Sequence, residues 1–195
     1  MSVTSSVIDK GVSVWGAKSA VTVTGNTVRD GDVQVTRYDG AEFAFGVTVT
    51  GNTVQRGSVQ VSSANASGNA PAIRVTGNTI TGNTSLCALK ISDVKLRPSN
   101  LTGNTITGNQ PDTFCLNGTL VENWTVPTAG PRIVVTFDAP AEGLTVAAGV
   151  TMTAPAGTII KFQPGAWSGT NLTVAGSLVA NGTSASPVVF TSLYD

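Results

Sequence analysis

The chain has 195 residues and carries 11 basic and 11 acidic side chains, so its formal net charge at pH 7 is zero. This balance excludes a broad basic surface that would hold nucleic acid or an anionic membrane, and no apolar run approaches the ~18 residues of a membrane-spanning helix. Charged residues make up only 11% of the chain and glycines number 22, a composition that favours strands and tight turns over helices.

The tetrapeptide Thr-Gly-Asn-Thr recurs in the first half of the chain. It begins at Thr24, Thr50, Thr76 and Thr102, so the step from one copy to the next never changes. A constant period of about 26 residues indicates one structural unit stacked on itself. Apolar and polar residues alternate around each copy, which is typical of strands with one buried face. The period aligns the apolar residues in three expected core columns: Val21, Val47 and Ile73; Val23, Val49, Val75 and Leu101; Val28, Val54, Ile80 and Ile106.

A second strand is expected at Asp32–Val35 in the first repeat and at Ser58–Val61 in the next, and a looser segment follows each. The chain would then return to its starting point one rung higher. Strands of successive rungs would pair about 4.8 Å apart. The repeat therefore predicts an all-β coil of parallel strands, in which each rung contacts only its neighbours.

The Gly-Asn step marks a sharp bend between two strands of one rung, because Gly and Asn tolerate a left-handed backbone. Asn26, Asn52, Asn78 and Asn104 recur at the same period. Their side-chain amides are predicted to hydrogen-bond from rung to rung as an asparagine ladder. The alternative is that these asparagines are solvated turn residues.

A second, slightly longer period appears near the C-terminus, where Leu144-Thr-Val146 returns as Leu172-Thr-Val174. This step predicts three further pairs of aligned residues: Val150 with Leu178, Ile160 with Val188, and Phe162 with Phe190.

The two periods divide one solenoid into parts. We expect 26-residue rungs in residues 1–110, an irregular transition in 111–140 with a strand at Arg132–Phe137, and 28-residue rungs in 141–195. Both ends of the chain read like strand, so we expect it to be a fragment of a longer protein.

The stretches VTVTGNTV and IRVTGNTITGN, together with the C-terminal block Leu144–Ser192, resemble repeats of the pectate-lyase-like superfamily. The resemblance covers most of the chain. It implies a right-handed, single-stranded parallel β-helix with rungs of about 26–28 residues, of the kind found in secreted and cell-surface proteins of bacteria and archaea. It implies no activity, because this fold carries lyases, hydrolases, adhesins and plain spacers.

Residues for catalysis are scarce. The chain lacks histidine, which excludes Ser-His and Cys-His catalysis, and two cysteines are too few for a zinc site. Enzymes of the resembled superfamily cluster acidic residues, but the acids here are scattered, and Asp30 and Asp32 are the only close neighbours. They are candidate calcium ligands; alternatively, Asp30 lies in a solvated turn and pairs with Arg56 one rung away. No catalytic motif can be carried over, so enzymatic activity is in doubt.

Two sets of residues are candidates for ligand binding. Lys90, Lys95 and Arg97 are a candidate patch for a sugar acid or phosphate, or else a solvated edge. Trp124 and Trp167 lie in predicted loops, where they would stack on sugar rings or pack against the solenoid.

Cys87 and Cys115 are separated by slightly more than one rung of the first period. If Pro111–Asp112 is a two-residue insertion, the two cysteines align on adjacent rungs, and both a disulfide and a pair of buried thiols stay open. The threonines Thr22, Thr24, Thr48 and Thr50 should point away from the core together, as in ice-binding solenoids, although Arg74 and Asn100 interrupt their column.

The sequence favours a non-catalytic structural or interaction module of an extracellular or cell-surface protein, with a glycan, a protein or further β-helix rungs as partner. A polysaccharide-active domain and an ice-binding solenoid are the alternatives. No cofactor is expected apart from calcium at Asp30 and Asp32.

Overall fold

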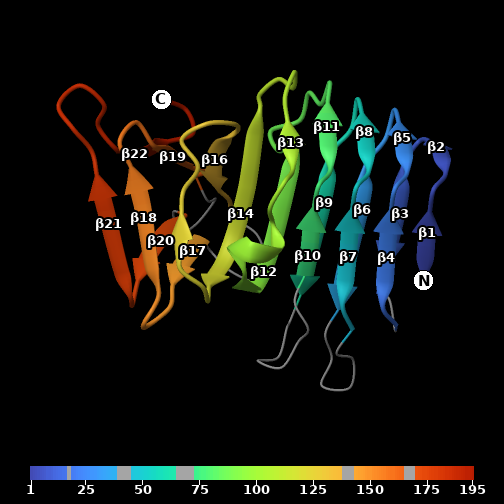
Figure 1. Ribbon diagram of the computed structural model, residues 1–195, viewed down its shortest axis with the longest axis horizontal. Helices are drawn as coiled ribbons and strands as arrows, with labels where there is room; N and C mark the ends of the chain where they lie inside the picture. The colour runs from blue at the N-terminus through green and yellow to red at the C-terminus, as the bar shows by residue number, and fades with distance from the viewer. Residues whose placement is uncertain (17–18, 39–44, 65–72, 138–142, 165–169) are drawn as a thin grey trace.

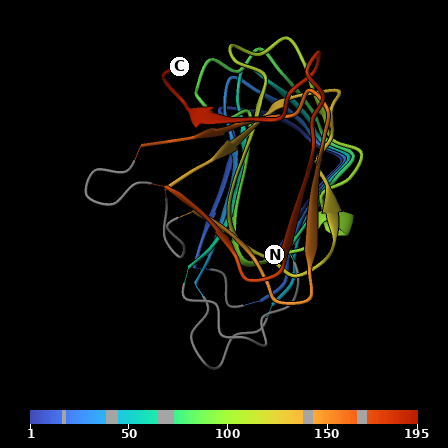
Figure 2. The same cartoon turned by 90° about the vertical axis from the view of Figure 1, so that its left-hand side faces the viewer.

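The computed structural model describes residues 1–16, 19–38, 45–64, 73–137, 143–164 and 170–195. These residues form a parallel β-solenoid of about six turns, and the turns succeed one another along the long axis of the molecule from the N-terminus to the C-terminus (Figure 1). Every strand pairing among them is parallel. The predicted all-β fold is confirmed. Viewed along its length, the solenoid shows its turns overlying one another around a shared interior (Figure 2).

Sheets A and B form two sides of the N-terminal half. Sheet A consists of β1 (Ser2–Thr4), β4 (Val21–Thr24), β7 (Val47–Thr50) and β10 (Ile73–Thr76). Sheet B consists of β2 (Val7–Asp9), β5 (Thr27–Arg29), β8 (Thr53–Gln55), β11 (Thr79–Thr81) and β13 (Thr105–Ile106).

Sheet C runs the length of the molecule, and sheet D belongs to the C-terminal half. The main path of sheet C is β3 (Val12–Trp15), β6 (Val33–Tyr38), β9 (Val59–Ala64), β12 (Leu89–Leu96), β14 (Thr113–Leu120), β16 (Arg132–Val135), β19 (Ile159–Phe162) and β22 (Val189–Ser192). The strands β17 (Gly143–Val146) and β20 (Asn171–Val174) branch from β14. Sheet D consists of β15 (Trp124–Thr125), β18 (Thr151–Pro155) and β21 (Ser177–Asn181).

The core consists of the predicted columns. Val21 aligns with Val47 and Val47 with Ile73, so these columns keep the 26-residue register. The first rung is shorter than expected, because Ser2 pairs with Thr22. The column residues are buried, except that Leu101 is half-buried. Because β-branched side chains stack on similar apolar neighbours one rung away, each rung covers the apolar face of the next.

The asparagine ladder is buried as predicted. Asn26, Asn52 and Asn78 are at most 1% exposed. The Oδ1 atom of Asn52 accepts from both the backbone N–H and the Nδ2 of Asn26, each at 3.0 Å, and Asn78 and Asn104 repeat this arrangement. Gly51, at φ +64°, supplies the left-handed bend before its asparagine. The side-chain oxygen of each asparagine thus accepts from the asparagine of the rung before it, and its side-chain nitrogen donates to the asparagine of the rung after it.

The C-terminal register differs from the constant step that the sequence predicts. Leu144 pairs with Leu172, as expected. However, Met152 rather than Val150 pairs with Leu178, and Ile160 and Phe162 pair with Phe190 and Ser192. The register shifts because the turns between strands differ in length from rung to rung. The turn before β18 has four residues and that before β21 has two, and the turn between β21 and β22 has seven. The strands keep their pairing, and the turns absorb the changes in length.

The ladder makes a testable contribution to stability. Substituting Asn52→Ala would leave the Asn26 N–H and the Val23 carbonyl, which accepts from Asn52 Nδ2 at 2.9 Å, without these bonds. Each orphaned buried group costs about 1–3 kcal/mol, so urea denaturation should show a loss of about 2 kcal/mol or more. The control Asn181→Ala removes an exposed asparagine and should stay within about 0.5 kcal/mol. Equal effects of the two substitutions would contradict the ladder.

The last rung should promote self-association. Phe190 pairs with the buried Ile160, yet it is 39% exposed, and β20, β21 and β22 each pair on one side only among the described strands. Open strand edges with apolar neighbours favour further strand pairing. Light scattering after gel filtration should therefore give a mass that rises with protein concentration. The substitution Phe190→Lys should lower that mass, whereas Thr53→Lys in mid-solenoid should not. A monodisperse monomer at high concentration would contradict the prediction.

Candidate functional site

The two halves of the solenoid meet at a break in strand pairing, which we call the seam. Sheet B ends at β13 and sheet D begins at β15, so these successive strands do not pair with each other. On the neighbouring side, the short helix η1 (Pro98–Asn100) follows β10 in place of a further strand of sheet A. Among the described strands, only those of sheet C continue past the seam, because β14 pairs with β12 on one side and with β16 and β17 on the other. Within the segment expected to be irregular, 111–140, the described residues 111–137 contain the three strands β14, β15 and β16.

A pocket of about 610 Å³ opens at the seam. Its volume falls within the range of about 300–1,000 Å³ that is usual for small-ligand sites. The core side chains Leu89, Phe114 and Leu116 of sheet C line its interior, and Leu101, Ile106 and Trp124 line it from either side of the seam. The surface of the pocket is therefore largely apolar, and its polar rim includes Ser99, Asn104, Glu122 and Asn123.

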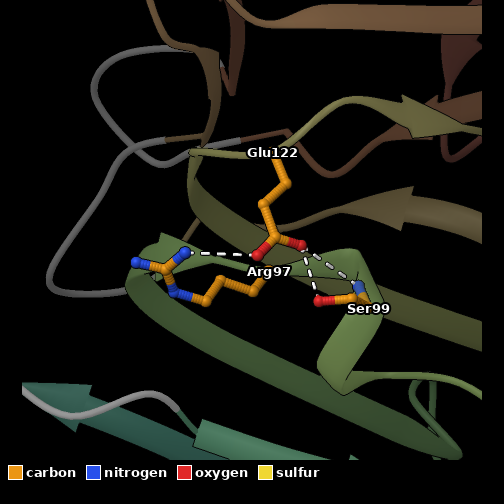
Figure 3. A network of polar contacts seen from close by, with 3 residues as sticks. All are labelled: Arg97, Ser99 and Glu122. Carbon is orange, nitrogen blue, oxygen red and sulfur yellow. Dashed lines mark hydrogen bonds and ion pairs between the residues drawn. The ribbon is translucent and has the colours of Figure 1, made fainter.

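Three polar residues hold the two sides of the seam together, and we call them the clasp. The Glu122 carboxylate lies between Arg97 and Ser99 (Figure 3). Arg97 Nη1 donates to Oε1 at 3.2 Å, and the Ser99 hydroxyl donates to Oε2 at 2.7 Å. Arg97 and Ser99 lie at the end of β12 and in η1, whereas Glu122 lies between β14 and β15. The clasp thus links successive rungs where sheets A and B stop.

The clasp alters the acidity of its carboxyl group. The hydrogen bond from the Ser99 hydroxyl, together with the Arg97 guanidinium, lowers the pKa of Glu122 below its ordinary value of 4.5, against the opposing effect of burial. About a third of the Glu122 side chain is exposed, so solvent screens the pair and its contribution to stability is small.

The predicted binding residues fall in different places. Trp124 lies in β15 instead of a loop, is half-buried and lines the pocket. Arg97 belongs to the clasp, whereas Lys90 and Lys95 are half-buried in β12 and do not line the pocket. Trp167 lies outside the described residues. Among the described candidates, Trp124 and Arg97 therefore lie at the seam.

The two neighbouring aspartates bind protein groups. Asp30 forms an ion pair with Arg56 one rung away, with Oδ1 2.5 Å from Nε, as the solvated-turn interpretation predicts. Asp32 Oδ1 accepts from the backbone N–H of Ser58 at 2.7 Å and from its hydroxyl at 2.9 Å. The described residues contain no cluster of three or more His, Cys, Asp or Glu side chains suited to a metal ion. Calcium binding by this pair remains a prediction.

The two cysteines form a disulfide, with Cα atoms 5.6 Å apart. They lie on adjacent rungs but not in the predicted register, because Lys90 is the residue that pairs with Cys115. Cys87 instead lies just before β12. The bond joins the segment before β12 to β14, and with the buried Val134 it forms a small apolar cluster separate from the main core.

The predicted threonine face exists as an array of aligned residues. Thr22 pairs with Thr48 and Thr24 with Thr50 in sheet A. The first column ends at Arg74, whereas the second continues to Thr76. Whether this face binds ice remains a prediction.

Sequence reasoning missed a second ladder and the acidic member of the clasp. The backbone N–H of Asn83 donates to Oδ1 of Asn109 at 2.9 Å, and that of Asn109 donates to Asp112 Oδ1 at 2.7 Å. The signal was a second Thr-Gly-Asn that follows the main repeat at Thr81 and Thr107. Glu122 had no comparable signal, because the register between β12 and β14, in which Leu96 pairs with Leu120, is what brings it to Ser99.

No protein-family model, curated protein or solved structure matches the chain. The fold is therefore assigned from its geometry. Among the described residues, no helix has the length and apolar character needed to cross a membrane.

The clasp predicts a specific pH dependence. Because folding lowers the pKa of Glu122, its stabilisation is present above about pH 4.5 and is lost as the pH falls through the folded-state value. Denaturation at pH 6 and pH 3 should show that Glu122→Gln loses less stability on acidification than the wild type, by up to about 1 kcal/mol. Ser99→Ala, which keeps the carboxylate but removes its strongest partner, should also weaken the dependence. Parallel pH profiles for all three proteins would contradict the role of the clasp.

Proposed function

We propose that this chain is a non-catalytic β-helix module of an extracellular or cell-surface protein, and that it holds a glycan or protein partner in the seam pocket. The observation that carries the proposal is the seam itself. The solenoid pairs strand on strand on either side of it, and where this pairing is interrupted an apolar pocket of about 610 Å³ opens beside Trp124. Sheet C gives the solenoid a continuous support, and the gap at the seam gives it a place for a ligand to bind.

Two further features support this proposal. The disulfide between Cys87 and Cys115 fits a protein of an oxidising compartment, because thiols stay reduced in the cytosol. The rung-to-rung pairing of sheet C makes the solenoid a stiff support on which the pocket keeps its shape. We also infer membership of the pectate-lyase-like superfamily, which the parallel solenoid and the Thr-Gly-Asn-Thr repeats support.

The role of Trp124 can be tested by binding measurements. The purified chain should be screened against cell-wall oligosaccharides and against a peptide array. Any bound compound should bind about tenfold more weakly to Trp124→Ala, because the aromatic ring lines the pocket. The matched control is Trp15→Ala, which removes an exposed tryptophan of β3 and should leave binding unchanged.

Two outcomes would overturn the proposal. The first is equal binding by both tryptophan variants, or no binding in either screen. The second is release of new chain ends from pectin or another polysaccharide by the wild-type chain, which would favour the polysaccharide-active alternative.

A further inference from the structure

The asparagine ladder stops at the seam with one hydrogen bond unmade. In each earlier rung the backbone N–H of the asparagine donates to Oδ1 of the asparagine in the next rung, at 3.0 Å for Asn26, Asn52 and Asn78. The N–H of Asn104 has no such acceptor among the described residues, and the Asn104 side chain already donates to the carbonyls of Val75 and Leu101. The backbone N–H of Asn104, which is hydrogen-bonded at the corresponding position of each earlier rung, is therefore a donor without a partner among the described residues, at the rim of the pocket.

The residue at the next corner does not complete the ladder. Asn123 directly precedes β15, but its Oδ1 accepts from the backbone N–H of Thr151 at 2.8 Å. Asn123 therefore accepts a hydrogen bond from the following rung and none from the N–H of Asn104. The ladder is interrupted at the same place as the pairing between β13 and β15.

The edge of β13 offers more backbone groups to the pocket. Thr105 and Thr107 donate to carbonyls of the preceding rung. Because the pairing direction alternates along a parallel strand, the N–H and C=O of Ile106 point the opposite way, toward the seam. Sheet B has no described strand on that side. The seam thus presents one donor from Asn104 and a donor and an acceptor from Ile106.

The described side chains that line the pocket offer no free charge to a ligand. The Glu122 carboxylate is held by Arg97 and Ser99, so the described part of the rim has no free acidic group to accept hydrogen bonds from sugar hydroxyls. The Asn104 amide and the Asn123 oxygen are also engaged. Besides the hydroxyls of Thr102 and Thr125, what remains is an apolar surface with backbone donors and an acceptor. These backbone groups match an extended peptide.

We propose that the seam pocket binds an extended, uncharged peptide segment that carries a carboxamide side chain, and that this segment takes the place of a missing rung. Its carboxamide oxygen accepts from the N–H of Asn104, as an asparagine of the next rung would. Its backbone pairs with Ile106, and its apolar side chains pack on Trp124 and Phe114. This inference rests on the proposed function, since it specifies the partner of the same pocket.

The repeat itself supplies a probe. The peptide Val-Thr-Val-Thr-Gly-Asn-Thr-Val, capped at both ends, has the sequence of residues 47–54. Its control carries Leu in place of Asn, which keeps the size of the side chain but removes the acceptor. Calorimetry should show about tenfold weaker binding of the control peptide, as expected for loss of a buried hydrogen bond.

Amide hydrogen exchange locates the bound peptide. The asparagine peptide should slow exchange at Asn104 and Ile106 by about tenfold or more, because both N–H groups become hydrogen-bonded. The leucine peptide should leave Asn104 unprotected. Trp124→Ala should weaken binding, whereas Trp15→Ala should not.

The same measurements contain the results that would overturn the inference. Protection confined to β20, β21 and β22 would mean that the peptide adds to the open C-terminal edge instead of the seam, and equal binding of the two peptides would exclude the carboxamide contact. If an oligosaccharide such as cellohexaose protects the seam and the peptide does not, the inference fails while the proposed function stands. If neither binds, both fail.

Discussion

Register between successive rungs is the constraint on which the rest of this structure depends. A buried asparagine amide finds its donors and acceptors only in a rung that lies in step with its own, as Asn52 does with Asn26 and Asn78. A slip would bury amide and backbone groups without partners, at about 1–3 kcal/mol for each group. Changes in chain length are therefore confined to turns, as the unequal turns before β18, β21 and β22 illustrate.

The seam shows what happens where this constraint cannot be met. Phe114 pairs with Leu89 on one side and with Ile133 on the other. The chain from Phe114 to Ile133 is clearly shorter than the chain from Leu89 to Phe114. The strand β16 of this shortened rung still pairs in sheet C, but β15 of the same rung does not pair with β13. The disulfide and the clasp both join β12 or its flanks to the rung of β14. Both links thus add to the β12–β14 pairing, next to the place where β13 and β15 stay unpaired. The same missing pairing leaves space for a ligand.

Fold and site differ in how far the sequence predicts them. The columns containing Val23 and Val28 and the ladder at Asn26 could be predicted, because each depends on a local pattern repeated at one period. The pairing of Ile160 with Phe190 could not, because the average step of the C-terminal rungs conceals turns of unequal length. Trp124 was identified as a binding candidate, but its partners in the pocket were not. Glu122 and Ser99 meet because β12 pairs with β14 in the register that sets Leu96 beside Leu120, and this register departs from the 26-residue period.

The sequence by itself determined the parallel solenoid, its buried columns and its asparagine ladder, since a fixed repeat of alternating apolar residues has few ways to bury its apolar face. It also determined which cysteines were available for a bond. Only the tertiary structure decided where the ladder ends, because that depends on which strand edges find partners across rungs. Among the described residues, Asn104 has a backbone donor without an acceptor and Ile106 lies on an unpaired edge, and both are properties of the stacked molecule. It is there, at the interruption of an otherwise regular pattern, that the candidate binding site lies.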